Sequence, residues 1–318
     1  MKNISRLLVV LICVVLCGCG KKDDGYYYDV IKQSLENSSQ VKSLEANANF
    51  KIKYDGADAA YNMDMEMSMD MTATEDPLQM KMDIKANMGG GLALNMDCYM
   101  MPQDSEYTLY MNVPMSGWMK QSIPAEQINQ YKVLEETEFS AELMTAFISS
   151  FKIVEDEKID EKKYLVAEGV LQGSLLDEAM KNLNESTLNS LKDSTLFSLD
   201  GLAGTDESEE ETEPTQPEIK MPDIPVKLYI NEKEKTVYRV SINLLSFANE
   251  ILNQTAALTD AASESTGEIK EALMEMTFTK YGDVETIELP EEAKSAIDMS
   301  EVYNGLDNNY GLDIPEES

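Results

Sequence analysis

The chain has 318 residues, of which 59 are acidic and 26 are basic, so its formal net charge is −33. Such a surface repels nucleic acid and anionic lipid head groups, and no nucleic-acid partner is expected. Histidine is absent. Because histidine is the commonest general base and the commonest metal ligand, the sequence predicts a protein that is not an enzyme and has no cofactor.

A short apolar segment lies near the start of the chain. Basic residues precede the uncharged stretch Leu7–Leu16, which is too short to cross a bilayer. The tetrapeptide Leu16-Cys17-Gly18-Cys19 then resembles the lipobox of bacterial lipoproteins. This resemblance implies that the signal peptide 1–18 is removed and that Cys19 is acylated, which would hold the protein on the extracytoplasmic face of the cell membrane. The alternative is an ordinary secretory signal that contains cysteines.

The remaining chain is predicted to be one domain, spanning residues 26–298. Residues 19–25 form a tether between the lipid and this domain. The segment 204–222 is rich in acidic residues, threonine and proline, so it is predicted to be a solvated insert. Residues 299–318 form an acidic tail, predicted to be mobile.

The domain begins with a helix and continues with strands. A loose 3.6-residue apolar repeat predicts a helix from Tyr26 to about Leu44. The period then changes to two residues, which is typical of strands. Six strands are predicted, over 45–54, 61–71, 78–84, 92–100, 107–113 and 118–123. The turns Glu75–Pro77 and Gly89–Gly91 are short, which indicates an antiparallel meander.

The second half of the domain mixes helices and strands. The predicted elements, in order, are helices at 125–133 and 138–150, a hairpin of 151–156 and 162–171, a helix from 174 to about 202, strands at 225–231 and 236–244, a helix near 246–261, strands at 269–281 and 284–289, and a helix near 291–298.

Three segments resemble one family. They are the hairpin Leu228–Val240, the run Ser116–Lys120 with its G-W-x-K pattern, and the closing element Phe278–Ala293 with its I-x-x-P-x-x-A spacing. Together they resemble the LolA/LppX-like half-barrel lipoproteins, in an uncharacterised Gram-positive branch. The resemblance implies an α+β fold, with a strongly curved antiparallel sheet covered by helices. It also implies a cavity that holds a lipid or an acyl chain.

Methionine is unusually abundant, with 21 residues. Methionines occupy alternate positions of one predicted strand and continue on the next two strands, so they project from one face. Nine of them are the candidate ligand-binding residues: Met63, Met65, Met67, Met69, Met71, Met80, Met82, Met96 and Met100. Their unbranched, polarizable side chains adapt to ligands of variable shape.

Three interpretations of this face stay open. It is a binding surface for a hydrophobic ligand, or it is a packed core in a module that meets an envelope protein partner, or it binds Cu(I) through thioether sulfurs. Copper would need ligands from neighbouring strands, because alternate side chains on one strand stand about 7 Å apart. Cys98 lies among the methionines and is expected to be a buried, inert thiol.

Overall fold

The computed structural model describes residues 25–56, 62–91, 93–104, 106–125, 145–182, 221–258 and 267–299. The predicted signal peptide, Cys19, the acidic tail beyond residue 299 and nearly all of the acidic insert lie outside these described residues. The predicted helix 125–133 does so too, apart from its first residue. Of the predicted helix 138–150, residues 145–150 are described and are helical.

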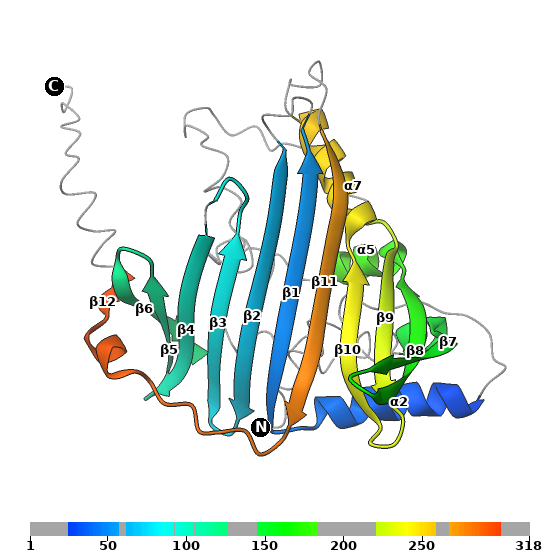
Figure 1. The fold of residues 1–318 in the computed structure, drawn as a ribbon, viewed down its shortest axis with the longest axis horizontal. Helices are drawn as coiled ribbons and strands as arrows, with labels where there is room; N and C mark the ends of the chain where they lie inside the picture. Colours follow the sequence, from blue (N-terminus) through cyan, green and yellow to red (C-terminus); the bar gives the residue numbers. More distant parts are fainter. Residues whose placement is uncertain are drawn as a thin grey trace.

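The described residues form one sheet of twelve strands, in the order β12-β6-β5-β4-β3-β2-β1-β11-β10-β9-β8-β7 (Figure 1). The strands are β1 (Ser43–Asp55), β2 (Met63–Glu75), β3 (Leu78–Asn87), β4 (Ala93–Gln103), β5 (Glu106–Val113), β6 (Gly117–Pro124), β7 (Lys152–Ile159), β8 (Lys162–Leu171), β9 (Ile224–Asn231), β10 (Thr236–Asn243), β11 (Glu268–Tyr281) and β12 (Ile297–Asp298). Neighbouring strands are antiparallel, except that β12 and β6 are parallel.

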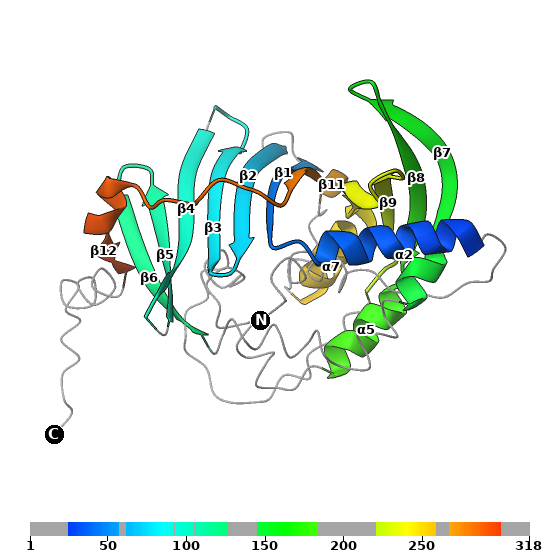
Figure 2. The ribbon, with the colours of Figure 1, turned by 90° about the horizontal axis from the view of Figure 1, so that it is seen from below.

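The sheet is curved and open, and helices lie on its concave side (Figure 2). Besides the helical residues 145–150, the described helices are α2 (Gly25–Ser39), α5 (Gly173–Asn182), α7 (Leu245–Leu258) and the short 3₁₀ helix η4 (Glu291–Ser295), which contacts β5 and β6 near one edge of the sheet. This architecture confirms the expected α+β fold, in which a strongly curved antiparallel half-barrel is covered by helices. The sheet does not close, because β12 and β7 remain as its two edges.

Strands β1 to β6 form the meander that the short turns predict. Residues 76–77 connect β2 to β3, with a cis peptide bond between Asp76 and Pro77. Gly89, Gly90 and Gly91 connect β3 to β4 with φ values of 73°, 58° and 85°. Residues with a side chain rarely adopt these angles, so the three glycines permit the chain to reverse here.

The core lies between the concave face and the helices. Helix α2 buries a stripe with helical spacing, made of Val30, Ile31, Ser34, Leu35 and Ser38. The apolar members of this stripe pack in one cluster with residues of β1, β2, β8, β9, β10 and β11. A smaller cluster of Tyr164, Val166 and Tyr229 lies on β8 and β9.

Two predicted boundaries near the N-terminal helix are corrected. Helix α2 ends at Ser39 rather than near Leu44. Leu44 belongs to β1, where it pairs with Ala73 of β2 and Tyr281 of β11, and its side chain is only 2% exposed. Burial between two strands outweighs the weak apolar repeat that would have continued the helix.

The predicted strand 284–289 and helix 291–298 are also wrong. Residues 284–289 have no strand ladder, and Figure 1 shows this segment crossing the lower ends of the meander strands rather than running beside one. The helix is shortened to η4, because the backbone at Ala296 is already extended (φ −56°, ψ 138°). The chain then pairs with β6 as β12.

Candidate ligand-binding face

The ladder of hydrogen bonds shows on which face each methionine lies. Residues that are directly paired in an antiparallel sheet share a face, as do alternate residues of one strand. Met71 of β2 is paired with Met82 of β3, and Met80 of β3 is paired with Met100 of β4. The nine candidate methionines therefore lie together on one face: Met63, Met65, Met67, Met69, Met71, Met80, Met82, Met96 and Met100.

The same ladder adds four methionines that the sequence analysis did not select. They are Met111 of β5, Met119 of β6, and Met274 and Met276 of β11. Their alternation within the predicted strands was a usable signal, but the pairing between strands was needed to place them. We call the thirteen residues together the methionine face.

The methionine face is the helix-covered, concave face of the sheet. Met71 belongs to the core cluster that contains Ile31 and Leu35 of α2, and Met80 and Met82 pack against that cluster. Figure 2 shows α2, α5 and α7 on this side. The face is thus part of the interior at one end, rather than a flat outer surface.

The methionine side chains of β2 are buried at the end near helix α2 and exposed at the start of the strand. Met71 is 5% exposed, whereas Met63 is 42% exposed. Met88 in the β3–β4 turn and Met115 in the β5–β6 turn are exposed at the same end, which is the upper edge in Figure 1. Because an antiparallel meander brings these turns and the start of β2 together, three exposed methionines mark one end of the face.

At that end, the β3–β4 hairpin and the β5–β6 hairpin carry no charged side chain near their turns. Residues 86–96 and 107–119 contain no Asp, Glu, Lys or Arg, although 27% of the chain is charged. Burying a charge beside an apolar ligand costs free energy, so an uncharged border suits an apolar ligand.

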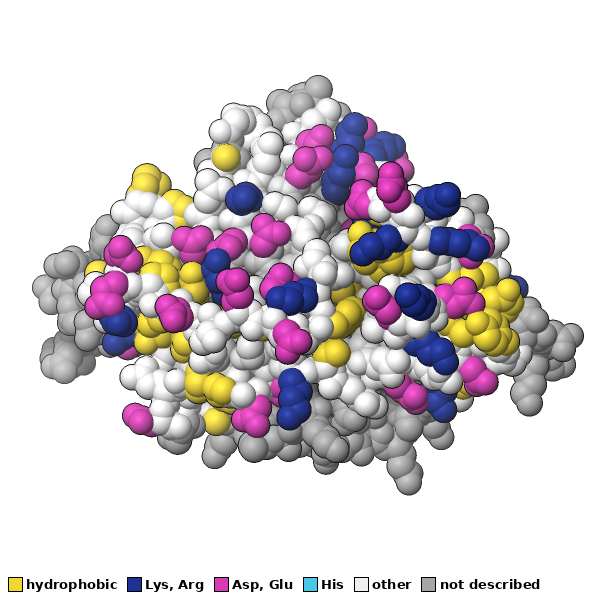
Figure 3. Space-filling view, turned by 60° about the horizontal axis from the view of Figure 1, so that its bottom comes forward, with side chains coloured by type: hydrophobic (Ala, Val, Ile, Leu, Met, Phe, Trp, Pro, Cys, Tyr) yellow, Lys and Arg dark blue, Asp and Glu magenta, His cyan; other side chains and the backbone are white. Residues whose placement is uncertain are grey.

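Most charged residues of β1 to β6 lie on the opposite, outer face; Glu75 at the end of β2 is the exception, because it pairs with Leu78 on the methionine face. Lys51 forms ion pairs with Glu66 at 3.4 Å and with Glu271 at 3.6 Å. The hydrogen bond that Lys51 donates to the Glu66 carboxylate, together with the negative charge of Glu271, raises the pKa of Lys51. The space-filling view in Figure 3 shows acidic and basic side chains interspersed on the surface.

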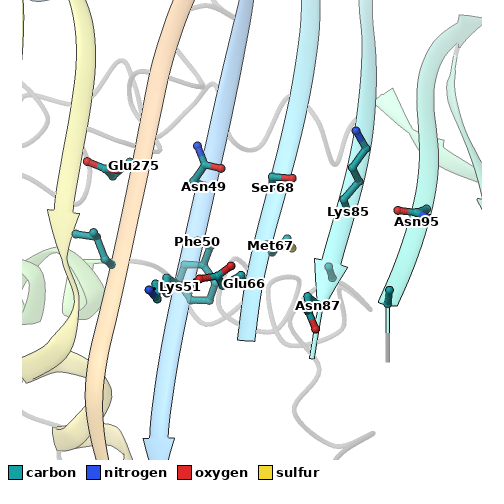
Figure 4. A pocket seen from close by; sticks show the side chains of 13 residues that line it. Asn49, Phe50, Lys51, Glu66, Met67, Ser68, Lys85, Asn87, Asn95 and Glu275 are labelled. Carbon is teal, nitrogen blue, oxygen red and sulfur yellow. Dashed lines mark ion pairs between the residues drawn. The ribbon is translucent and has the colours of Figure 1, made fainter. Parts of the chain in front are cut away.

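A hollow of about 450 Å³ lies on this outer face (Figure 4). Asn49, Ser68, Lys85, Asn95 and Glu275 line it from five strands. These side chains are polar or charged, and each belongs to the outer face by register. Apolar residues line the hollow as well, so its wall is mixed in character: Phe50, Met67, Ala86, Ala93 and Leu273.

Cys98 lies in the middle of the methionine face, between Met82 and Met111. Its side chain is a free thiol and is 3% exposed, which confirms the expected burial. Desolvation, followed by the negative charges of Asp97 and Asp83, raises the pKa of the thiol to about 11. The thiol is therefore protonated and weakly nucleophilic at neutral pH.

Two further properties concern the described part of the chain alone. No group of three His, Cys, Asp or Glu side chains is placed there to hold a metal ion. None of its helices combines the length and the apolar character that crossing a bilayer requires.

The sequence profile of a family of unknown function, DUF6612, matches residues 27–202, which is more than half of the chain. The protein belongs to this family. A comparison with curated proteins finds no match.

Among solved structures, this DUF6612 protein is similar to the Mycobacterium tuberculosis lipoprotein LppX. The two share 11% identity and a TM-score of 0.40 over 84% of this chain and 100% of LppX. It is also similar to LprF from Mycobacterium bovis, with 12% identity and a TM-score of 0.43 over 85% of this chain and 99% of LprF.

Proposed function

We propose that the protein binds a hydrophobic ligand, such as a lipid or an acyl chain, on its methionine face. The observation that carries this proposal is the register of β1 to β6. It gathers the nine candidate methionines on the concave face, while the charged residues of the same strands, apart from Glu75 at the end of β2, lie on the outer face. Thioether side chains adapt to ligands of variable shape, which suits a ligand without fixed conformation.

The dimensions of the face fit an extended chain. From Met63 to Met71 the strand rises about 26 Å, at about 3.3 Å per residue. Each methylene that leaves water contributes about 0.8 kcal/mol, so adding one methylene to the ligand strengthens binding by up to about fourfold. Affinity should therefore rise steadily along a series of fatty acids until the face is filled.

The proposal also places the protein at the membrane. Acylated Cys19 would hold it on the extracytoplasmic face of the cell membrane, and the six Cα-to-Cα steps from Cys19 to Gly25 reach at most about 22 Å. The start of α2 would then lie close to the bilayer. Since the chain is acidic, its lipid rather than its surface charge would provide the attachment.

A pair of neighbouring substitutions on β2 tests the proposal. Met67→Asp places a charge on the methionine face, whereas Ser68→Asp places the same charge on the outer face. We expect Met67→Asp to weaken binding of a fluorescent fatty acid by about tenfold or more, because burying an unpaired charge is costly. Ser68→Asp should bind as the wild type does.

The controls are the unfolding midpoint of both variants and native mass spectrometry of the wild type extracted from membranes. Equal binding by the two folded variants would contradict the proposal. A wild type that carries no ligand and binds no fatty acid would instead support a packed interaction module with an envelope protein partner.

A further inference from the structure

One row of residues across the methionine face consists only of sulfur-bearing side chains. The ladder pairs Met71 of β2 with Met82 of β3, Met82 with Cys98 of β4, Cys98 with Met111 of β5, and Met111 with Met119 of β6. We call these five residues the sulfur row. It crosses five consecutive strands without interruption.

The sulfur row provides the cross-strand neighbours that spacing along one strand does not. Directly paired residues in an antiparallel sheet have Cβ atoms about 4.5–5.5 Å apart. Methionine has three rotatable side-chain bonds, so sulfurs from adjacent strands can turn toward a common point. Cys98 has such a thioether on each side, from Met82 and from Met111.

The chemistry of the row selects a soft cation. Thiolate and thioether ligands favour Cu(I), whereas hard cations such as Mg²⁺ and Ca²⁺ require oxygen ligands. The nearest carboxylates in sequence, Asp83 and Asp97, are paired with each other on the outer face. They are therefore directed away from the row.

We propose that the sulfur row binds one Cu(I) ion, with the Cys98 sulfur and the thioethers of Met82 and Met111 as ligands. Met71 and Met119 extend the row on either side. When Cu(I) binds, a copper–sulfur bond to Cys98 replaces the S–H bond and the proton leaves to solvent. No group is oxidised or reduced.

Charge and exposure are both compatible with such a site. Cu(I) replaces a proton, so the net charge of the face does not change and no uncompensated charge is buried. Cys98 and Met71 are buried, while Met82, Met111 and Met119 are half-buried. The half-buried members leave an approach for the ion. This inference does not depend on the hydrophobic ligand.

The test uses the full chain with Cys13, Cys17 and Cys19 replaced by serine, so that Cys98 is the remaining thiol. Cu(I) is titrated without oxygen against the coloured Cu(I) chelator bicinchoninate. We expect the protein to withdraw one Cu(I) from the chelator and to release one proton. Cys98→Ala should abolish this binding.

Substitutions of single methionines locate the site. Met82→Leu and Met111→Leu should each weaken Cu(I) binding by at least about tenfold, which is the lower end of the loss when a supporting group is removed from a metal site. Met101→Leu is the control, because Met101 pairs with Thr108 on the other face of β4. Its affinity should not change. Methionine-to-leucine changes nearly conserve volume, so these variants should fold.

Three results would overturn the inference. They are a protein that takes no Cu(I) from the chelator, binding that survives Cys98→Ala in a folded protein, and binding that Met82→Leu and Met111→Leu leave unchanged. If Cys98→Ala fails to fold, the two leucine variants and the Met101→Leu control decide the question.

Discussion

At the scale of single residues, the sheet separates two kinds of side chain that alternate in the sequence. Met67 and Ser68 are neighbours in β2, yet by register Met67 belongs to the methionine face and Ser68 to the outer face. Cys98 shows the consequence for chemistry. Its burial on the methionine face keeps the thiol protonated well above neutral pH.

The raised pKa of Cys98 makes stability depend on pH. Below about pH 9 the thiol is protonated in both the folded and the unfolded chain. Between about pH 9 and 11 the unfolded chain loses the proton first, so the free energy of unfolding falls as the pH rises. We expect urea unfolding at pH 8 and pH 10.5 to show a larger loss for the wild type than for Cys98→Ala. An equal loss in the two proteins would contradict the assigned burial.

At the scale of elements, α2 is fixed to the β9–β10 hairpin by side chains near its C-terminal end. The Val237 amide donates a hydrogen bond of 2.9 Å to the buried Ser38 hydroxyl, and Tyr281 donates one to the Val237 carbonyl. The Asn37 side chain donates to the carbonyl of Lys235 at 2.9 Å. These contacts position the helix over the buried end of the methionine face.

Removing the Ser38 hydroxyl should loosen this attachment. Ser38→Ala leaves the buried amide of Val237 without its acceptor, and we expect it to lower the free energy of unfolding by about 1–3 kcal/mol. Ser39→Ala is the matched control, because its hydroxyl donates a hydrogen bond of 2.8 Å to the carbonyl of Glu36 at an exposed position. It should change stability by less than about 0.5 kcal/mol. Denaturant unfolding measures both, and equal effects would refute the role given to Ser38.

At the scale of the whole molecule, the acyl chain on Cys19 would hold an acidic protein to the membrane. Its methionine face would lie on the concave side of the sheet, toward the helices. The far end of that face, with Met63, Met88 and Met115, lies opposite the end where α2 packs. The proposed lipid attachment would therefore lie at the other end of the sheet from the uncharged end of the methionine face.

Attachment by lipid predicts a specific response to salt. A contact made by surface charge weakens as salt screens it, whereas an acyl chain is insensitive to screening. We expect the protein to stay with membranes washed in 1 M salt, a concentration at which the screening length is about 3 Å. Cys19→Ser should appear in the soluble fraction instead. Release of the wild type by salt, or retention of Cys19→Ser, would contradict acylation at Cys19.

Much of the fold could be predicted because one signal was strong. Apolar and other residues alternate within each of the segments 45–54, 63–71 and 78–84, and alternation depends only on the local chain. The sulfur row could not be predicted, because it depends on which residue of β4 pairs with which residue of β5. The short pairing of β12 with β6 was missed for the same reason, since residues 297–298 meet residues 119–120 across a long stretch of sequence.

The central claim is that a hydrophobic ligand lies on the methionine face, and photo-crosslinking tests it most directly. A fatty acid that carries a diazirine is bound to the wild type and activated by light, and the labelled residues are identified by mass spectrometry. We expect labels at Met63, Met65, Met67, Met69 and Met71 of β2, and at Met80 and Met82 of β3. Labels on the alternate residues of these strands, such as Ser68 and Lys81, or no label at all, would contradict it.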